Sequence, residues 1–280
     1  MKRLIALLLV GIAMLGAGEP RRIVSIDPAV TETVFQFGHG GAVVATDMTS
    51  TWPAAAAALP KLGYIRQLNA EGIIAQRPDL VLTSDKLQPR MVIEQLQQAG
   101  ITVRELPGAA DLPALRQRLL GVGEALGESA QAQRLYDGIT ARIDAVARRH
   151  PAGGTGPRVL FILHLMGGDV VCGGSGTAAD WLIRACGGRN GIDAPGYKPV
   201  GAEALLAMRP DVVVAMSTGP SGPMTRERIV AHHALTGLAA VQSGRVHLVD
   251  GTLMLGFGPR LGEAVEAFAD LLHGDGAAQR

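Results

Sequence analysis

Aromatic residues, cysteines and an excess of either charge are all scarce in this chain of 280 residues. Phe, Trp and Tyr together make up 4%, so an aromatic residue in a polar loop needs its own explanation. The formal net charge is +1 and no block of basic residues occurs, which is evidence against a nucleic-acid partner. No internal apolar run reaches the roughly 20 residues that span a bilayer, so we expect a chain that is not embedded in a membrane.

The first 18 residues have the composition of a secretory signal peptide. Lys2 and Arg3 precede an apolar run from Leu4 to Ala17, and small residues follow it. The run is too short for a membrane span, and the alternative is a buried N-terminal helix. No cysteine near the expected cleavage point can carry a lipid. We therefore expect export to the periplasm of a Gram-negative bacterium, with residues 1–18 removed.

The chain has two cysteines, Cys172 and Cys186. An oxidising compartment permits a disulfide between them, but their spacing does not show whether the Cα atoms are within reach. A metal site is disfavoured, because no second Cys or His pair stands at ligand spacing. The sequence leaves the bridge open.

A segment of 13 residues occurs twice, as "AEGIIAQRPDLVL" from Ala70 and "AEALLAMRPDVVV" from Ala202. The copies are 132 positions apart and share seven residues. In each, Ala-Glu begins a short helical pattern, and Arg-Pro-Asp ends it because proline cannot continue a helix. An unbroken apolar run follows, as in a strand buried on both faces. The repeat predicts two structurally related halves.

Strand-like and helical patterns alternate along the chain. The strand-like runs are residues 22–26, 42–46, 80–83, 102–107, 158–163, 212–216 and 245–249, and the helical patterns are residues 31–37, 91–99, 112–126, 177–186 and 262–272. Such alternation predicts parallel sheets with helices on both faces.

The predicted fold class is therefore α/β, with two Rossmann-like lobes. We place the N-terminal lobe at residues 20–127, a linking helix at 128–150 and the C-terminal lobe at 157–274. The helical pattern from Ser129 to Arg149 corresponds to roughly 30 Å of continuous helix. One long helix joining two lobes leaves a ligand cleft between them and restricts hinge motion more than a flexible linker would.

Enzyme motifs are weak. The stretch "GGSGT" at residues 173–177 lacks the final glycine of a nucleophile elbow, and "GHGGAV" at 38–43 does not match a dinucleotide-binding loop. No P-loop and no cluster of paired carboxylates occurs. We expect a binding protein that is not an enzyme; the alternative is a secreted enzyme.

The segment "KLGYIRQLNAEGI" places Tyr64 and Arg66 on a loop after Gly63 and before a helix that begins near Asn69. Together with "RIVSIDPAVTETVFQFG", "GTAADWLIRACGGRN" and "LMLGFGPR", it resembles the periplasmic haem-binding proteins of bacterial ABC haem importers. These belong to the helix-linked (class III) binding proteins, which also serve siderophores and vitamin B12. The resemblance implies that ferric haem b is the transported ligand, that Tyr64 binds its iron and that Arg66 supports Tyr64.

The chemistry of the two side chains agrees with these roles. Ferric iron prefers an anionic oxygen donor, and tyrosinate is an established haem ligand. A nearby guanidinium stabilises a phenolate. In an extended loop, residues two apart lie on the same side about 7 Å apart, so we expect the side chains of Tyr64 and Arg66 to meet. The alternatives are a tyrosine that covers an apolar edge beside a solvated arginine, and a cleft for a ferric siderophore or cobalamin.

The second axial position on the iron is open. Some members of the family add a histidine from the C-terminal lobe, in a Ser-His-Gly stretch. Here the sequence is "LHLMGG", which places His164 one residue early, and a shift of one residue turns a strand side chain to the opposite face. The candidates are His164, the thioether of Met166, and no protein ligand at all, which gives a five-coordinate haem.

The segment "LMLGFGPR" supplies candidate walls for the pocket. Leu253, Met254 and Phe257 suit contact with a flat macrocycle, and the alternative is ordinary core packing. Arg260 is a candidate partner for a haem propionate. The sequence does not indicate whether the cleft holds one haem or two.

Glu71 and Glu203 are equivalent in the repeat, each in the first turn of its helix. A carboxylate there also stabilises the positive end of a helix, and this is the alternative role. In related binding proteins one such glutamate on each lobe meets arginines of the membrane permease. The resemblance therefore implies a monomer that docks on an ABC permease dimer through these two residues.

Overall fold

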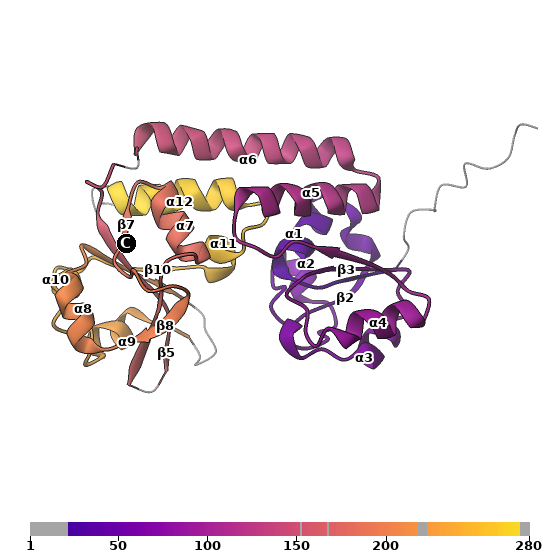
Figure 1. The fold of residues 1–280 in the computed structure, drawn as a ribbon, viewed down its shortest axis with the longest axis horizontal. Coiled ribbons are helices and arrows are strands. Elements are labelled where there is room, and N and C mark those ends of the chain that lie inside the picture. Colours follow the sequence, from indigo (N-terminus) through magenta and orange to yellow (C-terminus); the bar gives the residue numbers. More distant parts are fainter. Residues whose placement is uncertain (1–21, 152, 167, 218–222, 275–280) are drawn as a thin grey trace, which may run out of the picture.

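The computed structural model describes residues 22–151, 153–166, 168–217 and 223–274. It contains two α/β lobes with one long helix, α6 (Ser129–Arg149), between them in sequence. Figure 1 shows α6 along the top of the molecule, with a lobe below each end. The predicted fold class is confirmed, whereas the predicted signal peptide lies outside the described residues.

The N-terminal lobe is built on a parallel sheet of four strands in the order β2-β1-β3-β4. Alternate residues of the strands enter two separate cores: Val24 and Val81 pack with α3 and α4, and Ile23 and Leu82 pack with α1 and α5. Burial on both faces accounts for the unbroken apolar runs. The elements are β1 (Ile23–Ser25), α1 (Pro28–Gln36), η1 (His39–Ala42), β2 (Val43–Thr46), α2 (Ala54–Ala57), η2 (Ile65–Gln67), α3 (Ala70–Ile74), β3 (Leu80–Ser84), α4 (Met91–Gln98), β4 (Thr102–Leu106) and α5 (Leu112–Leu126).

The C-terminal lobe has a sheet in the order β10-β9-β5-β6-β8, with β7 paired to β5. The purely parallel sheet predicted here is wrong, because β6 runs antiparallel to both β5 and β8. The strands are β5 (Arg158–Met166), β6 (Asp169–Gly173), β7 (Arg189–Asn190), β8 (Tyr197–Val200), β9 (Val212–Met216) and β10 (Val246–Val249). The helices are α7 (Ala178–Ala185), α8 (Ala202–Met208), α9 (Arg226–Ala231), α10 (Ala239–Gln242), α11 (Gly251–Leu255) and α12 (Leu261–His273).

Helix α6 contributes to the cores of both lobes. Its residue Ala132 packs in a core of the N-terminal lobe with α1 and α5. Two to four turns later, Ile139, Ile143 and Val146 pack in a core of the C-terminal lobe with α7 and α12. The link is therefore a rigid element packed at both ends. No helix within the described ranges is long and apolar enough to cross a membrane.

The sequence repeat corresponds to a repeated local structure. Each copy forms a short helix, α3 or α8, followed by a buried strand, β3 or β9. The arginine before the proline has a left-handed backbone in both copies, with φ of 48° at Arg77 and 49° at Arg209. At Arg209 this conformation caps the end of α8, whereas Arg77 lies in the turn after α3; in both copies it precedes the turn of the chain into its strand.

The aspartate of each copy caps the start of the neighbouring strand. Asp79 accepts a hydrogen bond from the Arg22 N–H at 3.0 Å, and Asp211 accepts one from the Arg158 N–H at 2.7 Å. The Arg22 side chain donates to the Gln76 carbonyl, just after α3. The Arg158 side chain donates to the carbonyl of Met208, the last residue of α8. The Arg-Pro-Asp segment, which occurs at the same place in both copies, therefore links the helix, the turn and the strand in each lobe.

Cys172 and Cys186 are both buried free thiols. They lie in different cores, on opposite faces of the β5–β9 part of the sheet, so a disulfide between them is excluded in this structure. Burial raises the pKa of each thiol to about 12. Both residues act as small apolar side chains.

Candidate ligand-binding site

Tyr64 lies on an exposed loop between β2 and α3. Gly63, directly before it, has a φ of +111°, which residues with a side chain rarely adopt. Tyr64 itself is extended and precedes the turn η2, in which the Gln67 N–H donates to the Tyr64 carbonyl at 2.8 Å. Tyr64 is 40% exposed. A glycine hinge therefore presents this tyrosine on the surface, and the helix that follows begins after Asn69 as predicted.

Arg66 lies within the turn η2. The extended loop predicted between Tyr64 and Arg66 is wrong, because a 3-10 turn rises only about 2.0 Å per residue. Ile65 packs into the core, while Tyr64 and Arg66 are both exposed. Within the part of the chain that the structure describes, neither the Tyr64 hydroxyl nor the Arg66 guanidinium hydrogen-bonds to another group. Both groups are open to a ligand.

Backbone hydrogen bonds hold this loop at the carboxyl edge of the N-terminal sheet. The Met48 N–H, just after β2, donates to the Gly63 carbonyl at 2.8 Å. The Gln88 N–H, just after β3, donates to the Ile65 carbonyl at 2.9 Å. In open α/β sheets, ligands bind outside the carboxyl ends of the strands. Tyr64 therefore occupies the position at which this fold class places a ligand.

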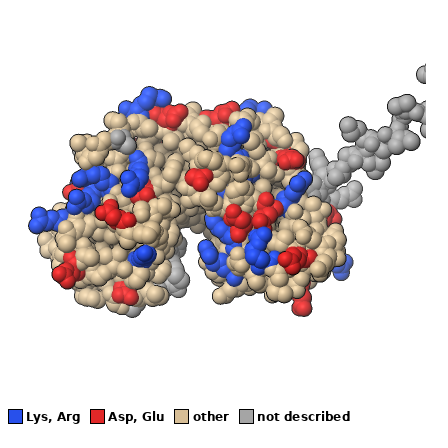
Figure 2. Space-filling view, in the orientation of Figure 1, with Lys and Arg blue, Asp and Glu red and all other residues tan. Residues whose placement is uncertain are grey.

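Two further apolar side chains on this edge were not identified from the sequence. Met48 and Trp52, in the loop after β2, are both exposed although both are large and apolar. The available signal was a tryptophan in a polar loop of a chain that is poor in aromatics. Figure 2 shows the surface hollowed between the two lobes, on the side away from α6. Large exposed apolar side chains are typical of a surface that binds a ligand or a partner.

His164 and Met166 lie near the carboxyl end of β5, in its hairpin with β6. The pairing is irregular between Ile162 and His164, where β5 has one more residue than β6. A bulge of this kind re-aims the side chains beyond it, so simple alternation does not give the direction of His164. His164 is half-buried and its Nδ1 is enclosed, with no hydrogen-bond partner among the described residues. Met166 is exposed.

The candidate wall residues of the segment from Leu253 to Phe257 are mostly core residues. Met254 and Phe257 are buried in a core of the C-terminal lobe, and Leu253 packs against it. The Phe257 ring meets Trp181 edge to face, with centroids 4.7 Å apart. This is the packing role left open as the alternative. Leu253, half-buried in α11 at the carboxyl end of β10, is the member of the group with surface left for a ligand.

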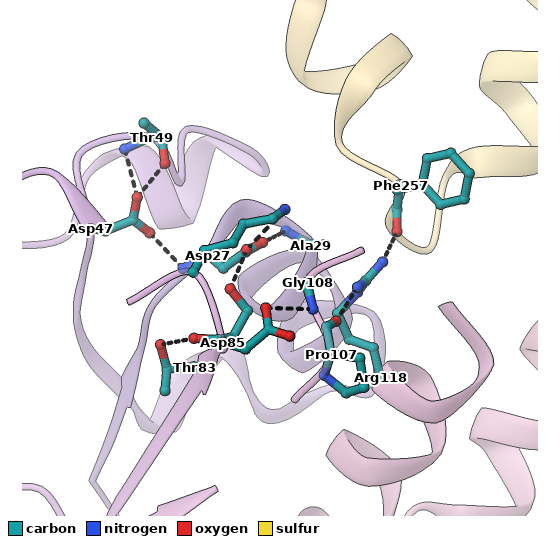
Figure 3. A network of polar contacts seen from close by, with 12 residues as sticks. Asp27, Ala29, Asp47, Thr49, Thr83, Asp85, Pro107, Gly108, Arg118 and Phe257 are labelled. Carbon is teal, nitrogen blue, oxygen red and sulfur yellow. Dashed lines mark hydrogen bonds and ion pairs between the residues drawn. The ribbon is translucent and has the colours of Figure 1, made fainter. Parts of the chain in front are cut away.

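A buried arginine joins the two lobes beside this segment (Figure 3). Arg118 of α5 donates from Nη1 to the Pro107 carbonyl and from Nη2 to the Phe257 carbonyl, the latter at 2.5 Å. Burial lowers the pKa of Arg118, and the charges of Asp27 and Asp85 oppose that shift. One side chain of the N-terminal lobe therefore anchors the backbone of the C-terminal lobe.

Asp27 and Asp47 organise the same edge (Figure 3). Asp27 follows β1 with a positive φ of 89° and caps α1 through the Ala29 N–H at 2.9 Å. Its own N–H donates to Asp47 Oδ1 at 2.9 Å, and the Ser84 hydroxyl donates to Asp27 Oδ2 at 2.7 Å. The ends of β1, β2 and β3 are thus tied together beneath the loop that carries Tyr64.

A second arginine, Arg260 of the C-terminal lobe, contacts the N-terminal lobe. Its Nε and Nη2 donate to the two carboxylate oxygens of Glu32 at 2.9 and 2.7 Å. Its guanidinium carbon lies 4.1 Å from the centroid of the Trp52 ring. Burial raises the pKa of Glu32, and the hydrogen bonds and charge of Arg260 oppose that rise. The role of Arg260 as a propionate partner stays a prediction, but two of its three guanidinium nitrogens are committed to Glu32.

Glu71 and Glu203 lie in the first turns of α3 and α8. Both are exposed, and no other group within the described residues pairs with either carboxylate. Asn69 caps α3 by accepting from the Gly72 N–H at 2.7 Å, whereas α8 begins at Gly201 with no side-chain cap. Figure 1 places both helices on the side of the molecule opposite to α6.

Among the described residues, no cluster of three or more His, Cys, Asp or Glu side chains is arranged to hold a bare metal ion. The donor groups of the candidate residues are instead the exposed phenol of Tyr64, the exposed thioether of Met166 and the half-buried imidazole of His164. This donor set fits a metal that arrives in its own organic macrocycle, because such a metal needs only one or two ligands from the protein.

Comparisons with known proteins agree with this architecture. The profile of the periplasmic binding protein family matches residues 23–253. The structure of periplasmic heme-binding protein BhuT in complex with two hemes is similar, with a TM-score of 0.82, 37% identity and coverage of 91% of this chain and 98% of that one. A periplasmic heme-binding protein from Pseudomonas aeruginosa gives a TM-score of 0.83 at 32% identity, covering 91% of this chain and 94% of its own.

A cobalamin-binding protein of Halobacterium salinarum is also similar. It is 27% identical over 264 residues, which cover 91% of this chain and 70% of the relative. These relatives differ in the ligands that their names state, and each of them matches about nine-tenths of this chain. The chain therefore belongs to the periplasmic binding protein family, and it has the helix-linked, class III architecture of the substrate-binding proteins that serve ABC transporters.

Proposed function

We propose that this protein captures ferric haem b in the cleft between its lobes and delivers it to an ABC importer. Tyr64 binds the iron through its phenolate, and Arg66 stabilises the charge of that phenolate. The observation that carries the proposal is the placement of Tyr64. It is exposed on a loop whose Gly63 holds a conformation suited to glycine, at the carboxyl edge of a parallel sheet, with Met48 and Trp52 nearby in sequence on the neighbouring loop.

The ligand set supports haem over a bare ion. A phenolate is a hard donor that suits ferric iron, and an adjacent guanidinium favours the anionic form. The exposed side chains Met48, Trp52 and Met166 give the two lobes apolar surface for a flat macrocycle. We assign no sixth ligand from the protein. The Nδ1 of His164 is enclosed, which leaves Nε2 as the ring nitrogen that could meet a ligand, and a thioether is a poor donor for ferric iron.

Delivery rests on Glu71 and Glu203. Each is exposed and unpaired within the described residues, and the repeat places one on each lobe. Two matched carboxylates suit a partner with two matched cationic sites, such as a permease dimer. In this proposal the protein works as a monomer in the periplasm.

Cobalamin is the second candidate ligand, because relatives with that ligand in their names match most of the chain. The cleft and the docking residues are common to both proposals. The difference lies at Tyr64, since the cobalt of cobalamin carries axial ligands of its own and needs no tyrosinate.

The test is a visible-absorption titration of the purified protein with hemin and, separately, with cyanocobalamin. We expect saturable hemin binding with a Soret band and a weak high-spin ferric band in the red, and no saturable cobalamin binding. Tyr64→Phe keeps the ring and removes the donor, so it should weaken hemin binding at least tenfold and shift the Soret band while the fold is retained. An unchanged spectrum and affinity in Tyr64→Phe would show that the phenolate does not bind the iron. The equivalence point also gives the number of haems per chain.

A further inference from the structure

The outward faces of α3 and α8 are apolar where a surface helix is normally polar. Ile74 of α3 is 37% exposed and Leu206 of α8 is 47% exposed, although both are large aliphatic residues. They occupy equivalent positions in the two copies of the repeat, 132 residues apart. An isolated exposed aliphatic residue needs no explanation, but two at matched positions in separate lobes do.

Each of these residues shares a helix face with the docking carboxylate. Glu71 and Ile74 are three residues apart, as are Glu203 and Leu206, and this spacing puts both members of a pair on one side of a helix. The next residue of that face is an exposed alanine in both helices. The inward faces are buried, through Ile73 in one lobe and Leu205 in the other. Each lobe therefore has the same exposed stripe on its repeat helix. A carboxylate, Glu71 or Glu203, lies near the start of the helix, and an aliphatic side chain, Ile74 or Leu206, lies one turn later.

The positions of the stripes indicate what covers them. Figure 1 shows α3 and α8 on the side opposite to α6, and Figure 2 shows the hollow between the lobes opening on that same side. A partner that covers both stripes therefore lies across the mouth of the cleft. Because the stripes are two copies of one surface, the matching partner has two copies of one complementary surface.

We propose that Ile74 and Leu206 are the apolar contacts that hold this protein on its permease dimer, each filling an apolar pocket beside a cation of one permease subunit. This inference rests on the proposed docking through Glu71 and Glu203 and assigns a different task to the aliphatic residues. Exposed charges mainly set orientation and association rate, whereas desolvated apolar contacts at the centre of an interface mainly set the dissociation rate.

The test measures association and dissociation rates of the haem-loaded protein on phospholipid vesicles that contain the cognate permease, with empty vesicles of the same lipid as a blank. Ile74→Ser and Leu206→Ser should each raise the dissociation rate roughly tenfold and leave the association rate nearly unchanged. The double variant should raise it roughly a hundredfold, because the two sites are on separate lobes. Val230→Ser is the matched control, since Val230 is 42% exposed on α9 outside the repeat, and it should change neither rate.

The reversal of both carboxylates, Glu71→Lys with Glu203→Lys, distinguishes this inference from the proposed docking. We expect the reversal to slow association and to reduce its dependence on salt. If it does so while the serine variants dissociate like the parent, the aliphatic contacts are refuted and docking through the carboxylates stands. If neither set changes either rate, both proposals fail. Equal binding to empty vesicles, or self-association that the serine variants abolish, would assign the stripes to a lipid surface or to a second copy of this chain and overturn the inference.

Discussion

His164 shows how one side chain decides the coordination number of the proposed haem. Its Nδ1 is enclosed within the lobe, so only Nε2 could meet the iron, and the bulge in β5 alters the direction of the side chain. The proposed five-coordinate haem predicts that His164 does not bind the iron. His164→Ala should then preserve a five-coordinate, high-spin ferric spectrum, measured by visible absorption and electron paramagnetic resonance. Met166→Ala is the parallel control on the same hairpin and should behave in the same way. A six-coordinate parent that becomes five-coordinate in His164→Ala would identify His164 as the second ligand.

The surroundings of single residues could be predicted from the sequence to different degrees. Tyr64 and Arg66 are candidates from the sequence because glycine, tyrosine, arginine and a helix start are adjacent in the chain, and the structure has the same local order. Their roles stay predictions. Met48 and Trp52 were missed because their exposure depends on where the loop after β2 lies. Arg260 was assigned to the ligand, and its pairing with Glu32 was missed because the two residues are 228 positions apart and meet only when the lobes come together.

The loop that carries Tyr64 is the element whose backbone sets the site. Gly63 has a φ of +111°, and an added Cβ would approach nothing closer than Leu68 Cδ2 at 3.7 Å, so the obstacle to a side chain is backbone strain rather than crowding. Gly63→Ala should lower the free energy of unfolding by about 1–3 kcal/mol, and the relaxing loop should move Tyr64 and weaken hemin binding. Chemical denaturation and hemin titration measure the two effects.

Gly100→Ala provides the matched control for that loop. Gly100 also has a positive φ, of 77°, with open space around it, but it lies at the end of α4 on the way to β4. It should lose a similar amount of stability and bind hemin like the parent. Equal loss of hemin binding in both variants would trace the effect to general destabilisation and leave Gly63 without a special role.

Helices and strands were predictable to different degrees. Helices α5 and α6 begin and end at the predicted residues, because caps, prolines and glycines mark helix ends locally. Strand β8 was missed because it is an exposed edge strand with Pro199 in it, so it lacks the apolar run of a buried strand. Strand β6 was missed although a Gly-Gly pair between two apolar runs, a hairpin signal, precedes it. Strand β6, which runs antiparallel to both of its neighbours, is what makes the C-terminal sheet mixed.

At the scale of the whole molecule, the pair Arg260–Glu32 should control the pH dependence of stability. In Arg260→Met the buried Glu32 loses the group that opposes the rise of its pKa, so its pKa rises further and ionising it costs more. The stability deficit of the variant should therefore be small below the ordinary glutamate pKa of 4.5 and grow to about 3 kcal/mol by pH 7. Urea unfolding across that range measures it.

Two controls accompany this prediction. The double variant Arg260→Met, Glu32→Gln removes the buried charge and should recover most of the loss at pH 7. Arg142→Met breaks a more exposed ion pair, with Glu266, and should cost under about 1 kcal/mol. A deficit in Arg260→Met that does not vary with pH would show that packing on Trp52, and not the charge of Glu32, determines the effect.

The arrangement of α6, α3 and α8 has a mechanical consequence. Helix α6 is packed into both lobes on one side of the molecule, and α3 and α8 lie on the opposite side (Figure 1). Between these two sides, the Arg118 and Arg260 contacts join one lobe to the other. A force that pulls α3 away from α8 therefore strains these two arginine contacts, because they hold the lobes together beyond the shared helix.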